Sequence, residues 1–144
     1  MTGETCSGGP LDVPTLEVMA QRATTHPLVD GWAFRPDALS PRRLELRLDE
    51  EQYPPPVAEA RLDVRWFEGG DYTVQYLETR GEEVWQCRWD RHEKSGAPTA
   101  HFHPPPDAAA TVESSPLGST HHLGVLFAVL DWTVERVEGL HGRR

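Results

Sequence analysis

The sequence is poor in cysteine, and its two cysteines stand in unrelated surroundings. Cys6 lies in a stretch rich in glycine and serine, whereas Cys87 lies in a strand-like run. Two such cysteines supply neither a disulfide framework nor the paired CxxC spacing of a zinc knuckle. We therefore expect Cys87 to pack as a small hydrophobic side chain.

Lysine is almost missing. Lys94 is the single lysine beside 13 arginines, and 23 acidic residues give the chain a net charge of -9. This charge argues against a general polyanion-binding protein. An acidic surface with so little lysine also suits a halophile, in whose salty cytoplasm charge interactions are strongly screened.

Long hydrophobic runs are missing as well. The longest apolar stretch, residues 125–130, is far short of the roughly 20 residues that cross a bilayer. Residues 1–10 lack the basic and apolar regions of a signal peptide. We expect no membrane contact and a cytoplasmic protein, with residues 1–13 as a disordered tail and residues 14–140 as one domain.

Familiar enzyme motifs are also missing. The sequence has no GxxxxGK[ST] phosphate loop, no GxGxxG turn, no GxSxG elbow and no HExxH helix. Their absence argues against nucleotide hydrolysis, dinucleotide-dependent redox chemistry and the commonest hydrolase designs.

Two segments carry apolar residues at helical spacing. The first covers residues 15–25, follows a proline suited to a first helical turn, and stops before Pro27. The second begins after a cap at Ser119 or Thr120 and ends near Gly139. Its apolar stripe consists of Leu123, Leu126, Phe127, Leu130, Val134 and Val137.

Apolar and polar residues alternate through the middle of the chain, which is the pattern of half-buried strands. The alternating segments are residues 44–48, 60–66, 72–76 and 84–91. Glycine-containing turns at residues 68–71 and 79–82 predict that the last three form an antiparallel meander. A short extended piece at residues 99–103 is expected at the sheet edge, because Pro104 prevents a longer ladder.

These elements predict an α+β fold, in which an antiparallel β-sheet meander of four to five strands carries an N-terminal and a C-terminal helix on one face. The face covered by the helices is expected to present Leu62, Val64, Trp66, Val74 and Trp85. Tryptophans can also stack nucleic-acid bases, but the alternation favours core packing for Trp66, Trp85 and Trp89.

Chemically reactive side chains are densest between residues 88 and 103. The group comprises Arg88, Asp90, Arg91, His92, His101 and His103. If residues 99–103 are extended, His101 and His103 point to the same side, about 7 Å apart by the rise per residue. Both can then contact one ligand.

Two imidazoles on one side suit RNA cleavage without a metal, because one group must take a proton from the 2′-hydroxyl and another must give one to the leaving oxygen. We expect His101 and His103 to fill these acid and base roles, and Asp90 to orient a histidine. Arg88 or Arg91 suits phosphate, because a guanidinium donates two parallel hydrogen bonds.

The remaining candidates for substrate binding are Arg65 and His92. The alternation places Arg61, Arg65 and Arg88 on the outer face of the sheet. A local basic patch of this kind can bind RNA although the chain as a whole is acidic.

Other interpretations stay open. The His-x-His pair and its neighbouring arginine and aspartate can be ordinary surface, where an exposed ion pair contributes at most about 1 kcal/mol. A zinc, nickel, copper or iron site is another, with candidate ligands His92, His101, His103 and His121 or His122. His121 and His122 cannot easily share one ion, because adjacent helical positions point about 100° apart. The chain can also be a non-catalytic module that binds a partner protein.

Residues 72–103 resemble the TumE-type family of toxins from toxin–antitoxin pairs. The shared pattern is a tyrosine-rich strand, a turn, an Arg-Trp-Asp unit and then clustered histidines. The matching positions are Tyr76, Arg88, Trp89, Asp90, His92, His101 and His103. The resemblance extends over residues 40–138 and includes the final helix.

The resemblance implies the toxin component of a type II toxin–antitoxin pair. It implies an intracellular target, expected to be RNA, and a cognate antitoxin encoded nearby, commonly a DNA-binding protein. The chain is then a candidate metal-independent endoribonuclease that needs no cofactor and uses the cluster of histidines and arginines.

Overall fold

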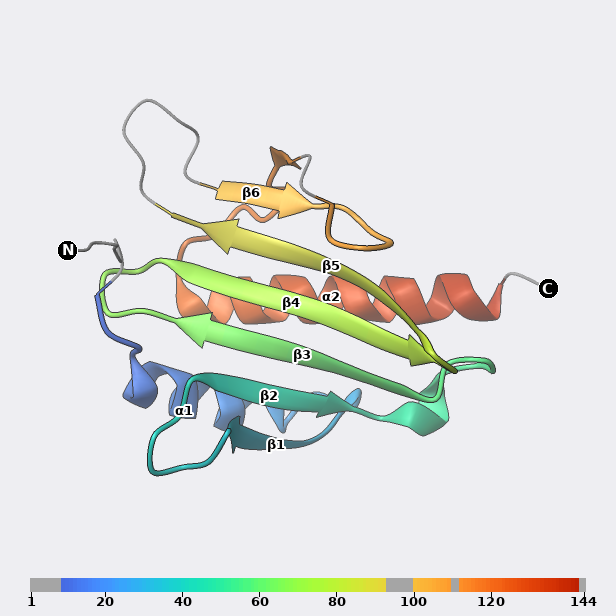
Figure 1. The fold of residues 1–144 in the computed structure, drawn as a ribbon, viewed down its shortest axis with the longest axis horizontal. Helices are drawn as coiled ribbons and strands as arrows, with labels where there is room; N and C mark the ends of the chain where they lie inside the picture. The colour runs from blue at the N-terminus through green and yellow to red at the C-terminus, as the bar shows by residue number, and fades with distance from the viewer. Residues whose placement is uncertain (1–8, 93–99, 110–111, 143–144) are drawn as a thin grey trace.

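A seven-stranded antiparallel sheet and two helices make up the computed structural model of the chain, which describes residues 9–92, 100–109 and 112–142 (Figure 1). The strands are β1 (Val29–Arg35), β2 (Arg43–Leu48), β3 (Glu59–Trp66), β4 (Tyr72–Arg80), β5 (Glu83–Arg91), β6 (Ala100–His103) and β7 (Glu113–Ser114). They pair in chain order as one meander. The predicted α+β class is confirmed, with seven strands among the described residues in place of four to five.

The first helix, α1 (Val13–Ala23), begins at a side-chain cap. The Asp12 carboxylate accepts hydrogen bonds from the Thr15 amide at 3.1 Å and from the Thr15 hydroxyl at 2.7 Å. The helix ends short of the predicted residue 25, and a turn follows it. Its buried residues are the ones that the apolar spacing indicated: Leu16, Met19, Ala20 and Ala23.

The second helix, α2 (His122–His141), is capped by His121 rather than by Ser119 or Thr120. The His121 Nδ1 accepts a hydrogen bond at 3.2 Å from the amide two residues further on. The Ser119 hydroxyl instead accepts one from the His121 amide at 3.1 Å. The helix continues two residues past Gly139, near which it was predicted to end.

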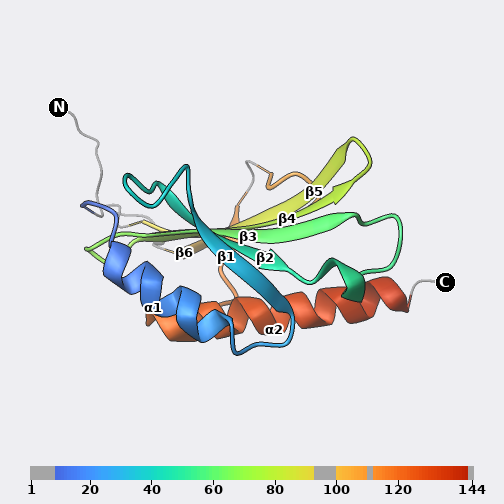
Figure 2. The ribbon, with the colours of Figure 1, turned by 90° about the horizontal axis from the view of Figure 1, so that it is seen from below.

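Both helices lie on one face of the sheet (Figure 2). The inward positions of the strands bury the core side chains Leu44, Leu46, Leu62, Val64, Trp66, Val74, Tyr76, Cys87 and Trp89. Trp85 is half-buried and stacks on Trp132 of α2, with ring centroids 6.4 Å apart. The predictions that Cys87 packs as a hydrophobe and that the tryptophans belong to the core are confirmed.

Two strands were not predicted, and each has a physical reason. In β1, a bulge between Val29 and Gly31 interrupts the alternation. The two residues of β7 are too few for any periodicity. Because β7 pairs with β6, the extended piece near His101 is not the edge of the sheet.

Between β2 and β3 the chain makes a short 3-10 helix, η1 (Glu50–Gln52). Residues 1–8 of the expected tail lie outside the described residues, as do residues 93–99, which include the first residue of the extended piece expected at residues 99–103. Neither described helix is long and apolar enough to cross a membrane. The sheet face opposite the helices is left uncovered by either of them (Figure 2).

Candidate functional site

Four of the predicted site residues lie together on the uncovered sheet face, which we call the outer face: Arg88, Asp90, His101 and His103. On β5, Arg88 and Asp90 alternate with the buried Cys87 and Trp89 and therefore point outward. Across the ladder to β6, Arg88 lies opposite His103. Asp90 lies opposite His101 in the same ladder.

Asp90 holds two of these residues. Its Oδ2 accepts a hydrogen bond from Arg88 Nε at 3.0 Å and lies 2.9 Å from His103 Nε2. The Asp90 side chain is only 6% exposed, and its Oδ1 is buried without a hydrogen-bond partner among the described residues. A buried carboxylate with one free oxygen fixes its neighbours and retains capacity for one further donor.

The His103 ring touches an oxygen at each nitrogen. Nε2 faces Asp90 and Nδ1 lies 2.9 Å from the carbonyl oxygen of Ala109. Neither a carbonyl nor a carboxylate oxygen donates a proton, so only the doubly protonated ring makes both hydrogen bonds. These two contacts fix the orientation of the His103 ring.

His101 differs from its neighbour. It lies two residues earlier on the same side of β6, as the extended backbone requires, and it is half-buried. Its ring makes no hydrogen bond with the part of the chain that the structure describes. The His101 ring is therefore open to a ligand on the outer face.

The other predicted binding residues do not join this group. Arg91 points to the opposite side of β5 from Asp90, and its Nη1 lies 3.3 Å from the Gly70 carbonyl oxygen and 3.5 Å from Asp71. His92 follows the end of β5. Arg65 is on the outer face but two strands away on β3, about 10 Å from Asp90 by the strand spacing.

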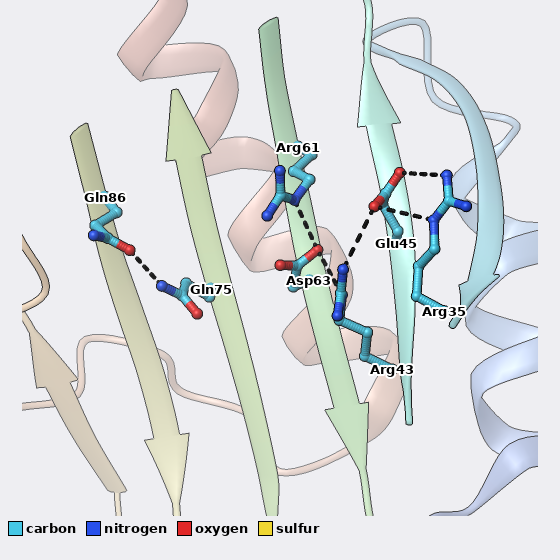
Figure 3. A network of polar contacts seen from close by, with 7 residues as sticks. All are labelled: Arg35, Arg43, Glu45, Arg61, Asp63, Gln75 and Gln86. Atoms are coloured by element: carbon cyan, nitrogen blue, oxygen red, sulfur yellow. Dashed lines mark hydrogen bonds and ion pairs between the residues drawn. The ribbon is translucent and has the colours of Figure 1, made fainter. Parts of the chain in front are cut away.

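The outer face continues as a polar network over β1 to β5 (Figure 3). Its contacts are Arg35–Glu45 at 3.3 Å, Arg43–Glu45 at 3.9 Å, Arg43–Asp63 at 3.5 Å, Arg61–Asp63 at 3.1 Å and Gln75–Gln86 at 2.5 Å. Each carboxylate in it is shared by two guanidinium groups. Arg47 and Arg65 are exposed and make no ion pair with the described residues. This part of the face therefore has more arginines than acids, although the chain is acidic overall.

A second polar cluster, on the helix-covered face, escaped the sequence analysis. Glu78 of β4 is fully buried and accepts hydrogen bonds from Arg136 of α2 at 2.7 and 2.9 Å, from Arg80 at 2.9 Å and from the Tyr76 hydroxyl at 2.5 Å. The Tyr76 hydroxyl also lies 2.8 Å from that of Tyr53. The sequence signal that could have revealed this cluster is a charged residue, Glu78, at an inward position of a strand.

The charges of this second cluster are stabilised from within. Burial alone would raise the pKa of Glu78, but hydrogen bonds from Arg136, Tyr76 and Arg80 outweigh it and lower the pKa below its ordinary value. Burial and the neighbouring Glu78 raise the pKa of Tyr76. Both oxygens of the Glu78 carboxylate accept hydrogen bonds, so we interpret the cluster as a structural link between α2 and β4.

The remaining histidine pair is closer than expected. The rings of His121 and His122 stack with centroids 4.2 Å apart, so the prediction that they diverge is wrong. His121 is the extended cap with φ -79° and ψ 139°, and the helical step of 100° does not apply to it. Burial, followed by the neighbouring His121, lowers the pKa of His122.

A metal site finds no support in this geometry. No group of three or more His, Cys, Asp or Glu residues that could hold a metal ion occurs within residues 9–92, 100–109 and 112–142. In particular, His121 and His122 lie at the start of α2 and His101 and His103 on the outer face.

Comparison with known proteins places the chain in a family. No curated protein and no solved structure gives a match. Residues 18–137 match the sequence model described as "Toxin TumE", a span that contains all of the strands and both of the residue clusters described above. The chain therefore belongs to the TumE family, the toxins of toxin–antitoxin systems, and a cognate antitoxin is its implied partner.

Proposed function

We propose that this toxin cleaves RNA without a metal ion, at the group formed by Arg88, Asp90, His101 and His103 on the outer face. The observation that carries the proposal is the shared Asp90 Oδ2, which contacts Arg88 at 3.0 Å and His103 at 2.9 Å. One buried carboxylate thereby holds a phosphate-binding cation beside an imidazole.

Arg88 is suited to the phosphate. Its Nε is engaged by Asp90, which leaves the two terminal nitrogens as donors in the fixed plane of the guanidinium. The Arg88 side chain is 33% exposed, against 6% for Asp90. The cation reaches solvent while the carboxylate that orients it stays out of reach of a polyanion.

The two histidines supply the proton transfers. The 2′-hydroxyl oxygen attacks the adjacent phosphorus and the bond to the 5′ oxygen breaks, which leaves a 2′,3′-cyclic phosphate and a free 5′-hydroxyl. His101 accepts the proton of the 2′-hydroxyl, because its ring is not engaged. His103 gives a proton to the 5′ oxygen, which takes the place of Asp90 at Nε2, and Arg88 offsets the charge that develops on the phosphate.

Growth and RNA integrity test this function together. The wild type, His101→Ala, His103→Ala and the remote His141→Ala would each be expressed from an inducible promoter in a host without the antitoxin. We expect the wild type and His141→Ala to stop growth and cut RNA, and both site variants to do neither. Purified wild type should leave 2′,3′-cyclic ends and keep its activity in excess EDTA.

Three results would contradict the proposal. The first is growth arrest with intact RNA, and the second is RNA cleavage that EDTA abolishes. The third is a folded His101→Ala chain that remains toxic. The first or third, together with retained binding of the antitoxin, would favour a toxin that acts by binding a partner protein.

A further inference from the structure

The outer face contains a cavity of about 200 Å³ beside β2, β3 and β4. Its outer-face lining consists of Glu45, Arg47, Glu59, Arg61, Leu77 and Thr79. These positions alternate with the buried core residues of the same strands, so the cavity opens on the same side of the sheet as Arg88 and His101. Glu45 and Arg61 of this lining belong to the network in Figure 3.

We propose that this cavity receives one base of the RNA strand whose phosphate lies at Arg88, and that it selects bases that carry an amino group. The inference rests on the proposed ribonuclease function and adds a choice of substrate to it.

Size and surface suit a single flat ring. The volume is below the roughly 300 Å³ at which pockets for drug-sized ligands begin, which favours one ring system. Leu77 provides an apolar contact, and guanidinium planes such as those of Arg47 and Arg61 stack on unpaired bases.

The charge of the lining argues for a base and against a phosphate. Four carboxylates, those of Asp30, Glu45, Glu50 and Glu59, surround the cavity together with two arginines. Carboxylates repel phosphate and accept hydrogen bonds from the amino groups of guanine, adenine and cytosine. Uracil has no amino group and presents two carbonyl oxygens, so it fits least well.

Two residues of the lining are available to a ligand. Glu59 is exposed, and its carboxylate makes no ion pair with the described residues. Arg47 is exposed as well, and its guanidinium lies directly over Gly31, where any Cβ would collide with it. Glycine at this position thus gives the cation its place at the rim of the cavity.

The cavity lies within reach of the cleavage site. Leu77 pairs with Gln86, which precedes Arg88 by two residues on β5. With a strand spacing of about 4.8 Å and a rise of about 3.4 Å per residue, Arg88 is about 8 Å from Leu77 and about 12 Å from Arg61. Nearby nucleotides of one strand can span these distances.

Binding to short RNAs tests the inference apart from cleavage. The full His101→Ala chain would be titrated into fluorescein-labelled hexauridylate that carries G, A, C or U at one central position, with fluorescence anisotropy as the readout. We expect the oligomers with G, A or C to bind about tenfold more tightly than all-uridine RNA, in line with about 1–3 kcal/mol for a specific base contact.

Further substitutions in the His101→Ala chain test whether the base preference arises at the cavity. Glu59→Gln replaces an acceptor oxygen by an amide donor and should reduce the preference to less than about threefold, since one specific contact is lost. Gly31→Ala should displace Arg47 and weaken all four oligomers. Glu17→Gln, on the exposed side of α1, is the matched control and should change nothing.

Equal affinity for the four oligomers, or a preference that Glu59→Gln leaves intact, would overturn the inference. Amide chemical-shift changes at Leu77 and Thr79 with acetyl-arginine amide, but with none of the four nucleosides, would overturn it in favour of a basic side chain of a protein partner. Wild-type cleavage without base preference would leave the proposed function standing. Base-selective binding without cleavage by the wild type would sustain the base site and refute the ribonuclease.

Discussion

Removal of the Arg136 guanidinium should lower the free energy of unfolding by about 3–5 kcal/mol, because it leaves a buried carboxylate without its main partner. Arg136 donates two of the four hydrogen bonds that Glu78 accepts, and its side chain is 7% exposed. A hydrogen bond to a charged group contributes about 1.5–3 kcal/mol, so two such bonds agree with this range. Arg136→Met keeps much of the packing against Trp85, whose ring centroid is 3.5 Å from the guanidinium carbon.

Urea unfolding followed by tryptophan fluorescence would measure the loss, which corresponds to a fall of roughly 10 °C in melting temperature for a chain of this size. Glu78→Leu combined with Arg136→Met should recover much of the stability, since the buried carboxylate is gone and its other charged partner, Arg80, is 26% exposed and can be solvated. Arg22→Met, at an exposed arginine of α1, is the control and should cost less than about 1 kcal/mol. A loss below about 1 kcal/mol in Arg136→Met, or a double variant no more stable than the single one, would refute the reasoning.

Three further predictions concern titratable groups. Burial lowers the pKa of His122, so the unfolded chain binds this proton more readily than the folded one, and the stability that the neutral ring contributes above about pH 6.5 is lost as the pH falls. Urea midpoints should therefore rise between about pH 5 and 7, and they should rise less steeply in His122→Asn. Asp90→Asn should lower the free energy of unfolding by about 1–3 kcal/mol, because Arg88 and His103 lose their shared carboxylate. An unchanged urea midpoint would contradict this. Burial raises the pKa of the Cys87 thiol to about 12, so iodoacetamide should label Cys87 near pH 8 only after the chain is unfolded. Mass spectrometry would measure the labelling, and equal labelling of Cys87 in the folded chain would count against the reasoning.

Local periodicity predicted most of the architecture. The alternation on β3, β4 and β5 indicated both the meander and the face that the helices cover, because a side chain's direction in a strand depends only on its position. The same rule failed for β1, where Asp30 and Gly31 at the bulge break the pattern. It failed for β7, where pairing with β6 defines a strand of two residues.

The site was predictable in part for the same reason. The period of two placed His101 and His103 on one side and separated Asp90 from Arg91, although the grouping by sequence proximity had put both in one cluster. The ion pair between Glu78 and Arg136 joins residues 58 positions apart in the sequence. No local sequence pattern specifies which distant arginine pairs with a buried acid. Likewise, the contact of His103 with Ala109 depends on the path of a loop.

The position of α2 after all seven strands has a consequence during synthesis. Each strand can pair with its predecessor as it leaves the ribosome, because the sheet order is the chain order. The inward face of β4 and β5, which carries Tyr76 and Trp89, is not covered by a helix until α2 has been synthesised. Until then the Glu78 carboxylate also lacks its partner Arg136. A partly translated chain should therefore be readily cleaved by proteases, and its sheet should become stable only when translation has passed Arg136 of α2.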